Sequence, residues 1–441
     1  MNNAAAGGIV WEEGDKNDTL LSHFLTTSIF YLVLLNPLID LVSGFLSSVL
    51  HFPAFGLVLR AMVIMFSGLL VLVIPIRKSI PFMWFVMITF ALVMLRMIRI
   101  DVTVGKVAYD IHYLGRGYLF FLAISMFIYM LSVPSSLSLF KRYFIFTWVL
   151  VTVMVGLHFL TGYGQPTYKT GEGYISYFDS GNQLTFVYTS AWWVIVSLLL
   201  RRWWLRLIFT FMTLAILLAI GTKTGFVLII GMTGLFALYW TKRKSIWLFA
   251  GTVLLSVGLM VVAVLNLRTI LLAIIDFYVN YSSVAEKFTR NAGVDPLTIV
   301  SSQRDVMVGY AAQIIGRFNF KDIIIGIGVG NYAQQLAIIS RVPGLTEVDT
   351  VDLLAGWGIV GLVFFYSPFV FLFVRLARRW SYAVAKAEKW GYKRMPYVVQ
   401  GLITMYVVAS SGSGHIAFAP SPMIGMAVMM IFAWKLSEKE G

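Results

Sequence analysis

Long apolar stretches follow one another along the chain after a polar, acidic segment of 19 residues. Most approach the roughly 20 residues that an α-helix needs to cross a bilayer. We predict helices rather than barrel strands, because a helix satisfies its own backbone hydrogen bonds in lipid and because the stretches do not alternate between apolar and polar positions. Twelve membrane-spanning helices are expected, over residues 20–46, 54–75, 80–100, 117–133, 143–161, 181–200, 205–221, 225–240, 246–266, 351–374, 397–416 and 420–435.

One connection between these stretches is far longer than the others and only moderately polar. Pro296, Pro343 and several glycines interrupt it, and helical stretches are expected near residues 270–290 and 301–317. Connections of this length usually carry function or helices of their own. The predicted fold is therefore an all-α polytopic integral membrane protein with one long external loop. Its parts are a bundle of nine spans at residues 1–266, the external loop at 267–350 and a bundle of three spans at 351–441.

The composition favours the same class. Hydrophobic residues make up 59% of the chain and charged residues 12%, against roughly 25% charged in ordinary soluble domains. A soluble fold needs more polar surface, so a water-soluble enzyme, a disordered chain and a nucleic-acid-binding module are all disfavoured. The net charge is +14, but with the N-terminus inside, the cytoplasmic segments hold 20 of the 34 Lys and Arg residues and 7 of the 20 acids. This asymmetry predicts that both termini are cytoplasmic.

Five cations fall at the outer-leaflet side of the predicted topology: Arg60, Arg96, Arg99, Lys223 and Arg304. Ionisable groups at membrane depth cost about 2.5–3.5 kcal/mol on insertion scales and are functional candidates by default. A cluster of them suits a lipid diphosphate, because arginine offers a bidentate fork and lysine a point charge. The alternative for each is that the side chain snorkels to lipid headgroups.

Three carboxylates, Glu347, Asp349 and Asp352, come directly before a predicted span. Asp349 and Asp352 are three residues apart and would share a helix face. A carboxylate here is a candidate general base for a hydroxyl group. The alternative is structural: Thr346 and Asp349 resemble a capping box with Asp in place of Glu, and acids in a first turn favour the helix dipole.

Other chemistry is poorly supported by the sequence. Residues 326–331 (GIGVGN) do not fit GxGxxG and lack the GK[ST] ending of a P-loop, so we interpret them as a tight turn that lets backbones approach closely. Cysteine is absent and the five histidines are scattered without HExxH. We therefore expect no metal site and no cofactor.

Three sequence blocks, in this order along the chain, resemble the conserved patterns of a known protein superfamily. They are AIGTKTG at residues 219–225, SQR at 302–304 followed by IGIGVGNY at 325–332, and EVDTVDLLAGWGIVG at 347–361. They are similar to the patterns S-R/K-[GT]-G, GR…GxGxGNF and HNxYLxxLxxxGxxG of the O-antigen ligase and Wzy-type polysaccharide polymerase superfamily of membrane glycosyltransferases. The long external loop between the blocks also resembles that superfamily.

The resemblance implies a metal-independent inverting glycosyltransferase in the bacterial cytoplasmic membrane. Its donor would be an oligosaccharide on undecaprenyl diphosphate, and a chain-length regulator would be a further partner. Lys223 and Arg304 would bind the diphosphate, Glu347 or Asp349 would be the base, and the candidates for sugar binding are Asp352 and Asn331.

Residue 347 distinguishes the two subtypes of this superfamily, ligase and polymerase. Ligases usually place His where this chain has Glu347, so the acidic version looks more like a polymerase of polysaccharide repeats. The alternatives are an O-antigen ligase that transfers the glycan to a lipid core, and a lipid-linked glycan transporter or flippase. Transporters usually show paired halves or matched broken helices, and the sequence shows neither.

Overall fold

The computed structural model describes residues 34–51, 133–167, 173–178, 180–222, 304–341, 345–412 and 419–437, with isolated positions between them. Every regular element in these ranges is helical, and the one β-type pairing within them is an isolated antiparallel bridge between Pro166 and Tyr174. The prediction of an all-α fold is confirmed for this part of the chain. The predicted spans at 54–75, 80–100, 117–133, 225–240 and 246–266 lie outside the described residues, apart from isolated positions.

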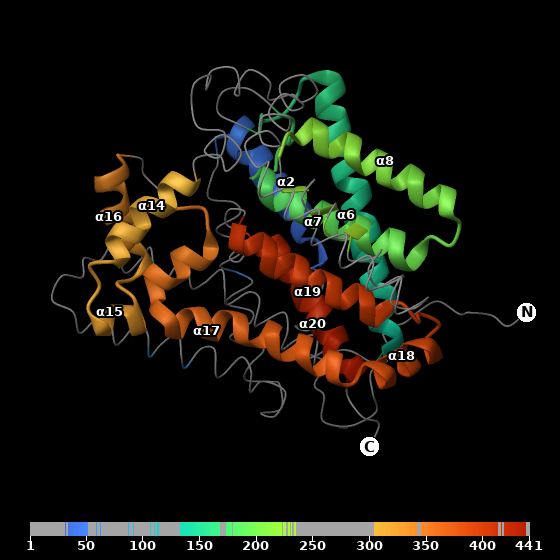
Figure 1. Cartoon of the computed structure of the whole chain (residues 1–441). Coiled ribbons are helices and arrows are strands. Elements are labelled where there is room, and N and C mark those ends of the chain that lie inside the picture. Colours follow the sequence, from blue (N-terminus) through green and yellow to red (C-terminus); the bar gives the residue numbers. More distant parts are fainter. Residues whose placement is uncertain are drawn as a thin grey trace, which may run out of the picture.

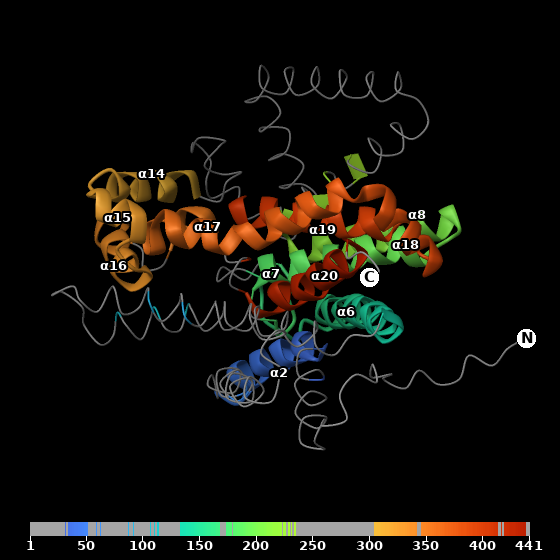
Figure 2. The same ribbon diagram turned by 90° about the horizontal axis from the view of Figure 1, so that it is seen from below.

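Seven helices and one π-helical segment form a bundle (Figures 1 and 2). They are α2 (Asn36–Val49), α6 (Val133–Thr161), α7 (Gly181–Val194) with its π-helical continuation η1 (Ile195–Leu199), α8 (Trp203–Ile220), α17 (Asp349–Arg378), α19 (Met395–Gly412) and α20 (Pro420–Ser437). In Figure 2, α17 and α19 lie on one side of the bundle and α2 and α6 on the other, with α7 and α20 between them.

Four shorter helices lie at the two ends of α17. A group of three, α14 (Arg304–Ile315), α15 (Phe320–Ile325) and α16 (Val329–Ser340), surrounds its N-terminal end, and α18 (Trp380–Lys389) follows its C-terminal end (Figure 1). Helix α14 confirms the predicted helix at 301–317, and the stretch at 270–290 lies outside the described residues. α17 therefore connects the two ends of the bundle.

Three helices among the described residues are long and apolar enough to cross a membrane: Phe140–Thr161, Trp203–Ile220 and Asp349–Arg378. Large apolar side chains on these helices face outward, as at Leu160, which is 79% exposed, and Phe211, which is 69% exposed. In a bilayer such surfaces contact lipid rather than water. These helices indicate a membrane protein, and the remaining spans stay predictions.

The helix that contains the predicted span 143–161 begins earlier than expected. Residues 134–142 were predicted to lie between spans, but they belong to α6, whose long apolar part, Phe140–Thr161, matches the prediction within a few residues. Pro134 lies in the first turn, where its missing N–H breaks no helical hydrogen bond. The helix predicted at 181–200 is confirmed in its bounds, and from Ile195 it continues as a π-helix.

Buried polar pairs connect the bundle helices to one another. Trp148 Nε1 donates to Thr213 Oγ1 at 3.0 Å, which connects α6 to α8. The hydroxyls of Tyr366 and Ser410 lie 2.8 Å apart and connect α17 to α19. In an apolar bundle such hydrogen bonds add to close van der Waals packing, which is the main attraction between membrane helices. The Tyr366–Ser410 pair helps to fix how α17, which carries the candidate acids, sits against α19.

Candidate functional site

The candidate site begins at a break in α17. Gly358 has φ +66° and ψ −165°, which are not helical values. The break releases the carbonyl groups of Ala355 and Gly356 from the helical hydrogen-bond pattern. Ile327 N–H donates to Ala355 O at 3.0 Å, and Gly328 N–H donates to Gly356 O at 2.7 Å. The glycine-rich block that joins α15 to α16 is thus hydrogen-bonded to the opened turn of α17.

Glycine is required on both sides of this contact. A Cβ at Gly326 would lie 2.3 Å from Gly356 O, and a Cβ at Gly358 would lie 2.4 Å from the Ile324 carbonyl. Gly326 has φ +71°, a left-handed conformation that other residues rarely adopt. The interpretation of residues 326–331 is confirmed for the close backbone approach, but the turn is limited to residues 326–328, because Val329–Asn331 begin α16.

Two of the candidate acids are buried in the first turn of α17. Asp349 is 0% exposed and Asp352 is 1% exposed. They lie three residues apart in the helix, so they share a face as expected. Thr346 directs both its N–H and its hydroxyl at Asp352 Oδ1, at 3.1 and 2.6 Å. A carboxylate oxygen with two donors is firmly positioned.

The predicted capping box between Thr346 and Asp349 was wrong. The N-cap residue of α17 is Val348, and no side chain caps the helix there. The Thr346 hydroxyl has one proton, and it is donated to Asp352 instead. The threonine oxygen accepts a hydrogen bond from Val348 N–H at 3.2 Å, which closes the turn before the helix.

Glu347 projects from this turn and pairs with Arg304. Arg304 Nη2 lies 3.0 Å from Glu347 Oε2, with the side chains 17% and 50% exposed respectively. Arg304 Nε is buried, and no described residue accepts a hydrogen bond from it. Glu347 has φ +60°, a left-handed conformation that costs a non-glycine residue of order 1–3 kcal/mol and is often found at functional sites.

Tyr332 is a member of this cluster that the sequence analysis did not identify. Its side chain is fully buried on α16 beside Asp352. Burial first, and the charge of Asp352 second, raise the pKa of the Tyr332 hydroxyl far above its ordinary value. Tyr332 stays protonated at neutral pH and can act as a hydrogen-bond donor. The sequence feature that could have identified Tyr332 is its position directly after Asn331, at the end of the glycine-rich block.

Asn331, a candidate for sugar binding, contacts a lysine that is far from it in the sequence. Its Oδ1 accepts a hydrogen bond from Lys106 Nζ at 3.3 Å. The adjacent Gly330 N–H donates to Asp110 Oδ1 at 2.8 Å, and a Cβ at Gly330 would lie 2.7 Å from Lys106 O. Asn331 and Gly330 therefore join the start of α16 to Lys106 and Asp110, and the sequence analysis did not foresee these contacts.

Four of the predicted diphosphate ligands, Arg60, Arg96, Arg99 and Lys223, lie outside the described residues. The segment before Lys223 is described. Gly221 ends α8 with φ +75°, and the hydroxyls of Thr222 and Thr185 lie 2.5 Å apart. Of the predicted site residues, the structure thus brings Arg304 and Glu347 together with Asp352 close by. Asp349 is buried in the same helical turn as Asp352, but the groups that its charge affects are Tyr366 and Tyr406.

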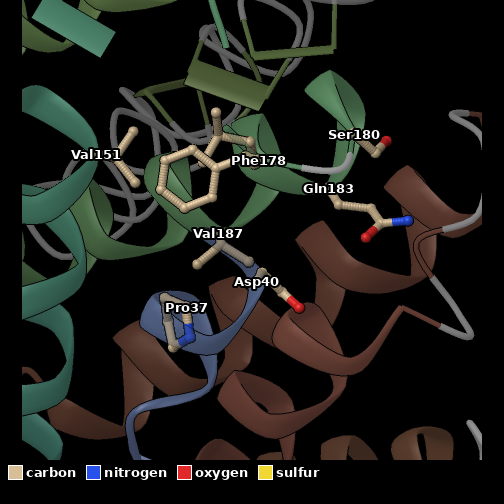
Figure 3. Close-up of a pocket in the computed structure, with 8 residues that line it drawn as sticks. Pro37, Asp40, Val151, Phe178, Ser180, Gln183 and Val187 are labelled. Atoms are coloured by element: carbon tan, nitrogen blue, oxygen red, sulfur yellow. The ribbon is translucent and has the colours of Figure 1, made fainter. Parts of the chain in front are cut away.

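A second polar feature lies between α2, α6 and α7 (Figure 3). Asp40, Ser180 and Gln183 line a pocket of about 350 Å³, counting the part open to solvent. Asp40 is 8% exposed, and its Oδ2 lies 3.5 Å from Asn36 Nδ2. The sequence analysis missed this acid, although a carboxylate inside the apolar stretch 20–46 was visible.

Within the described ranges, no three or more His, Asp or Glu side chains are arranged to hold a metal ion. No protein-family model and no curated protein matches the chain. The fold and the site therefore define a helical membrane protein with an arginine and three carboxylates at one end of a broken apolar helix.

Proposed function

We propose that the chain is a polysaccharide polymerase that joins undecaprenyl-diphosphate-linked oligosaccharide repeats at the outer face of the bacterial cytoplasmic membrane. The observation that carries this proposal is the Arg304–Glu347 pair, formed by residues 43 positions apart and lying near the buried Asp352. A cation and a solvent-accessible carboxylate at one site are what transfer from a diphosphate donor to a sugar hydroxyl requires. The three sequence blocks support the same function: the second and third contain Arg304, Glu347 and the glycines in contact, and the first contains Lys223, a further candidate for diphosphate binding.

In the proposed reaction, Arg304 binds the diphosphate of the donor. Lys223, Arg60, Arg96 and Arg99 are the further candidates for this role. The acceptor hydroxyl gives its proton to a carboxylate, and its oxygen attacks the anomeric carbon from the face opposite the diphosphate. The bond between that carbon and the diphosphate oxygen breaks, and the carrier leaves as the diphosphate. Fixed positive charge stabilises the negative charge that develops on the leaving group.

Glu347 is the better candidate for the base. Its side chain is 50% exposed, whereas Asp349 and Asp352 are buried. An acceptor hydroxyl must come within hydrogen-bond reach of the base. We assign Asp352 a positioning role, because it holds Thr346 and hence the turn that presents Glu347.

The ion pair suggests an order of events. Without substrate, Arg304 neutralises Glu347. A diphosphate carries more negative charge than one carboxylate and presents several acceptor oxygens, so it competes for the same guanidinium. Binding of the donor would release Glu347 to act as the base.

The test is extension of lipid-linked repeats by purified protein, followed by resolving the products by chain length. Glu347→Gln is expected to abolish the ladder of products, and Arg304→Gln to weaken use of the donor. Glu388→Gln is a matched control, because Glu388 is also an exposed glutamate in an ion pair, with Lys393 at 2.6 Å, at the other end of α17.

Each alternative has its own outcome. Normal chain extension by Glu347→Gln would contradict the assignment of the base. Transfer of one glycan to a lipid core without a chain-length distribution would indicate a ligase. Movement of labelled lipid across liposomes without any acceptor would indicate a flippase.

A further inference from the structure

A second charged region lies at the opposite end of the bundle from the candidate site. Lys141 of α6 donates a hydrogen bond to the Tyr392 hydroxyl, which precedes α19. Arg375 of α17 lies 3.9 Å from the centre of the Trp434 ring on α20. Arg379 donates to Ser437 O at 2.6 Å. These contacts show that α6, α17, α20 and the start of α19 meet at one end (Figure 1).

Helix α8 brings further cations to this end. Arg206 lies near enough to Arg394 for the two positive charges to interact, and Arg201 and Arg202 immediately precede the helix. We call this group of residues the basic end. Its described cations are Lys141, Arg142, Arg201, Arg202, Arg206, Arg375, Arg378, Arg379, Lys386, Lys389, Lys393, Arg394 and Lys435. Glu388 is the one acid that the described part of the chain places among them.

Several cations of the basic end lie over aromatic rings. Arg202 lies 6.0 Å from the centre of the Trp204 ring, and Lys386 lies 5.9 Å from that of Trp390. Tryptophan and tyrosine are enriched at the headgroup level of membranes, where one side of the ring is apolar and the other is wet. Cations beside such rings are at the depth of lipid phosphates.

Helix α18 has the character of an interfacial helix. It is 10 residues long, too short to span a bilayer. Ala383 and Ala387 are buried on one face, and Glu388 and Lys389 are exposed on the other. A short helix with charged side chains on its exposed face that joins two apolar helices is suited to lie in the membrane surface.

We propose that the basic end binds the phosphate groups of anionic phospholipids in the leaflet against which α18 lies. Cations from separate elements, such as Arg206 of α8 and Arg394 just before α19, repel one another and are brought into favourable contact when an anion lies between them. The aromatic rings and the apolar surfaces of α8 and α17 that continue from this end favour a lipid over a soluble phosphate. This proposal does not depend on the proposed enzymatic function.

The test uses the purified full-length chain in neutral detergent micelles. Thermal unfolding is measured with added phosphatidylglycerol, with the same amount of phosphatidylcholine, and with the same concentration of inorganic phosphate. We expect phosphatidylglycerol alone to raise the unfolding midpoint by several degrees, because a ligand that binds only the folded state stabilises it. The increase should shrink at high salt.

Two matched triple variants locate the effect. Arg202→Gln, Arg378→Gln and Arg394→Gln together remove three exposed cations of the basic end, and the phosphatidylglycerol shift should fall by more than half. Arg317→Gln, Lys321→Gln and Arg341→Gln together remove three exposed cations near the candidate site, and the shift should be retained.

The opposite results would overturn the proposal. These are equal shifts with phosphatidylcholine or inorganic phosphate, or a full shift in the basic-end variant. If that variant does not fold, the proposal is tested by mass spectrometry of the intact wild-type protein in micelles, which measures the lipids that stay bound. Retention of phosphatidylglycerol in preference to phosphatidylcholine supports the proposal, and equal retention overturns it.

Discussion

Glu347 combines a left-handed backbone with a half-exposed carboxylate, and the two properties have different consequences. The backbone conformation lowers stability, because only glycine adopts it without steric cost. The carboxylate adds little to stability, since a half-exposed ion pair is worth at most about 1 kcal/mol. A residue that costs stability and returns little is typical of a position retained for function.

Two substitutions at Glu347 separate these effects. Glu347→Gln removes the charge and keeps the backbone cost, whereas Glu347→Gly removes both. The glycine variant should be the more stable of the two by about 0.5–1 kcal/mol, although both should be inactive. Thermal unfolding of the two purified variants measures the difference, and a glycine variant less stable than the glutamine variant would contradict this account of the strain.

Asp352 offers a second prediction for a single residue. Thr346 donates twice to one carboxylate oxygen, and an asparagine oxygen can accept the same two hydrogen bonds. Asp352→Asn should therefore keep stability and most of the activity, whereas Asp352→Ala should lose about 1–3 kcal/mol by leaving buried donors unsatisfied.

The kinetic constants distinguish positioning from catalysis at Asp352. A positioning role predicts that the rate of chain extension falls in Asp352→Ala and recovers in Asp352→Asn, with little change in KM for the donor. Loss of activity in the asparagine variant equal to that in Glu347→Gln would show that Asp352 is itself the base.

Among the elements, the break in α17 decides how the acids are placed. The half-helix before Gly358 carries Asp349 and Asp352 and is hydrogen-bonded to the α15–α16 connection through Ala355 and Gly356. The half-helix after the break continues the apolar helix Asp349–Arg378, which is long enough to cross a membrane. The short α15 begins with a reciprocal capping box between Asn319 and Asp322, so the segment that contacts the break is itself anchored.

The glycine contact can be tested with alanine. Gly326→Ala and Gly358→Ala place a Cβ within 2.4 Å of backbone atoms at positive φ, and each should cost about 2 kcal/mol or more. Gly309→Ala in α14 is the matched control, since a Cβ there meets nothing within 4 Å. It should be neutral or stabilise by up to about 1 kcal/mol. Equal thermal stability of all three variants would contradict the close approach.

The sequence predicted some of these elements well. The apolar stretches at 205–221 and 420–435 correspond to α8 and α20 within a few residues. A long uninterrupted apolar run predicts a helix reliably, because a helix satisfies its backbone hydrogen bonds without outside partners. The break at Gly358 was not predicted, since its carbonyl groups bond to residues about thirty positions earlier in the chain. The hydrogen-bond partners of Thr346 and Asn331 were missed for the same reason. A polar side chain has several possible partners, and the tertiary packing determines which of them lies within reach.

At the scale of the whole molecule, the bundle has two chemically different ends. One carries the helices α14–α16 with Arg304 and the acids, and the other carries the basic end and α18 (Figure 1). Cations concentrate on the cytoplasmic side of membrane proteins. The predicted topology therefore places the basic end in the cytoplasm and the candidate site outside.

Single-cysteine labelling can test this orientation directly, because the chain has no cysteine. Lys321→Cys and Lys389→Cys place one exposed thiol at each end. A membrane-impermeant maleimide should label Cys at position 321 in intact spheroplasts and at position 389 only after permeabilisation. Labelling of both positions from the same side would contradict the orientation.

The most direct measurement of the central claim is the initial rate of chain extension in a double-mutant cycle of Arg304→Gln and Glu347→Gln. We predict that Glu347→Gln slows the reaction by about 10²–10⁴-fold and Arg304→Gln by about 10²–10³-fold. The double variant should be little slower than the slower single variant, because residues that act together are not additive. A wild-type rate in Glu347→Gln, or effects of the two substitutions that simply multiply, would contradict the claim that the two residues act as one site.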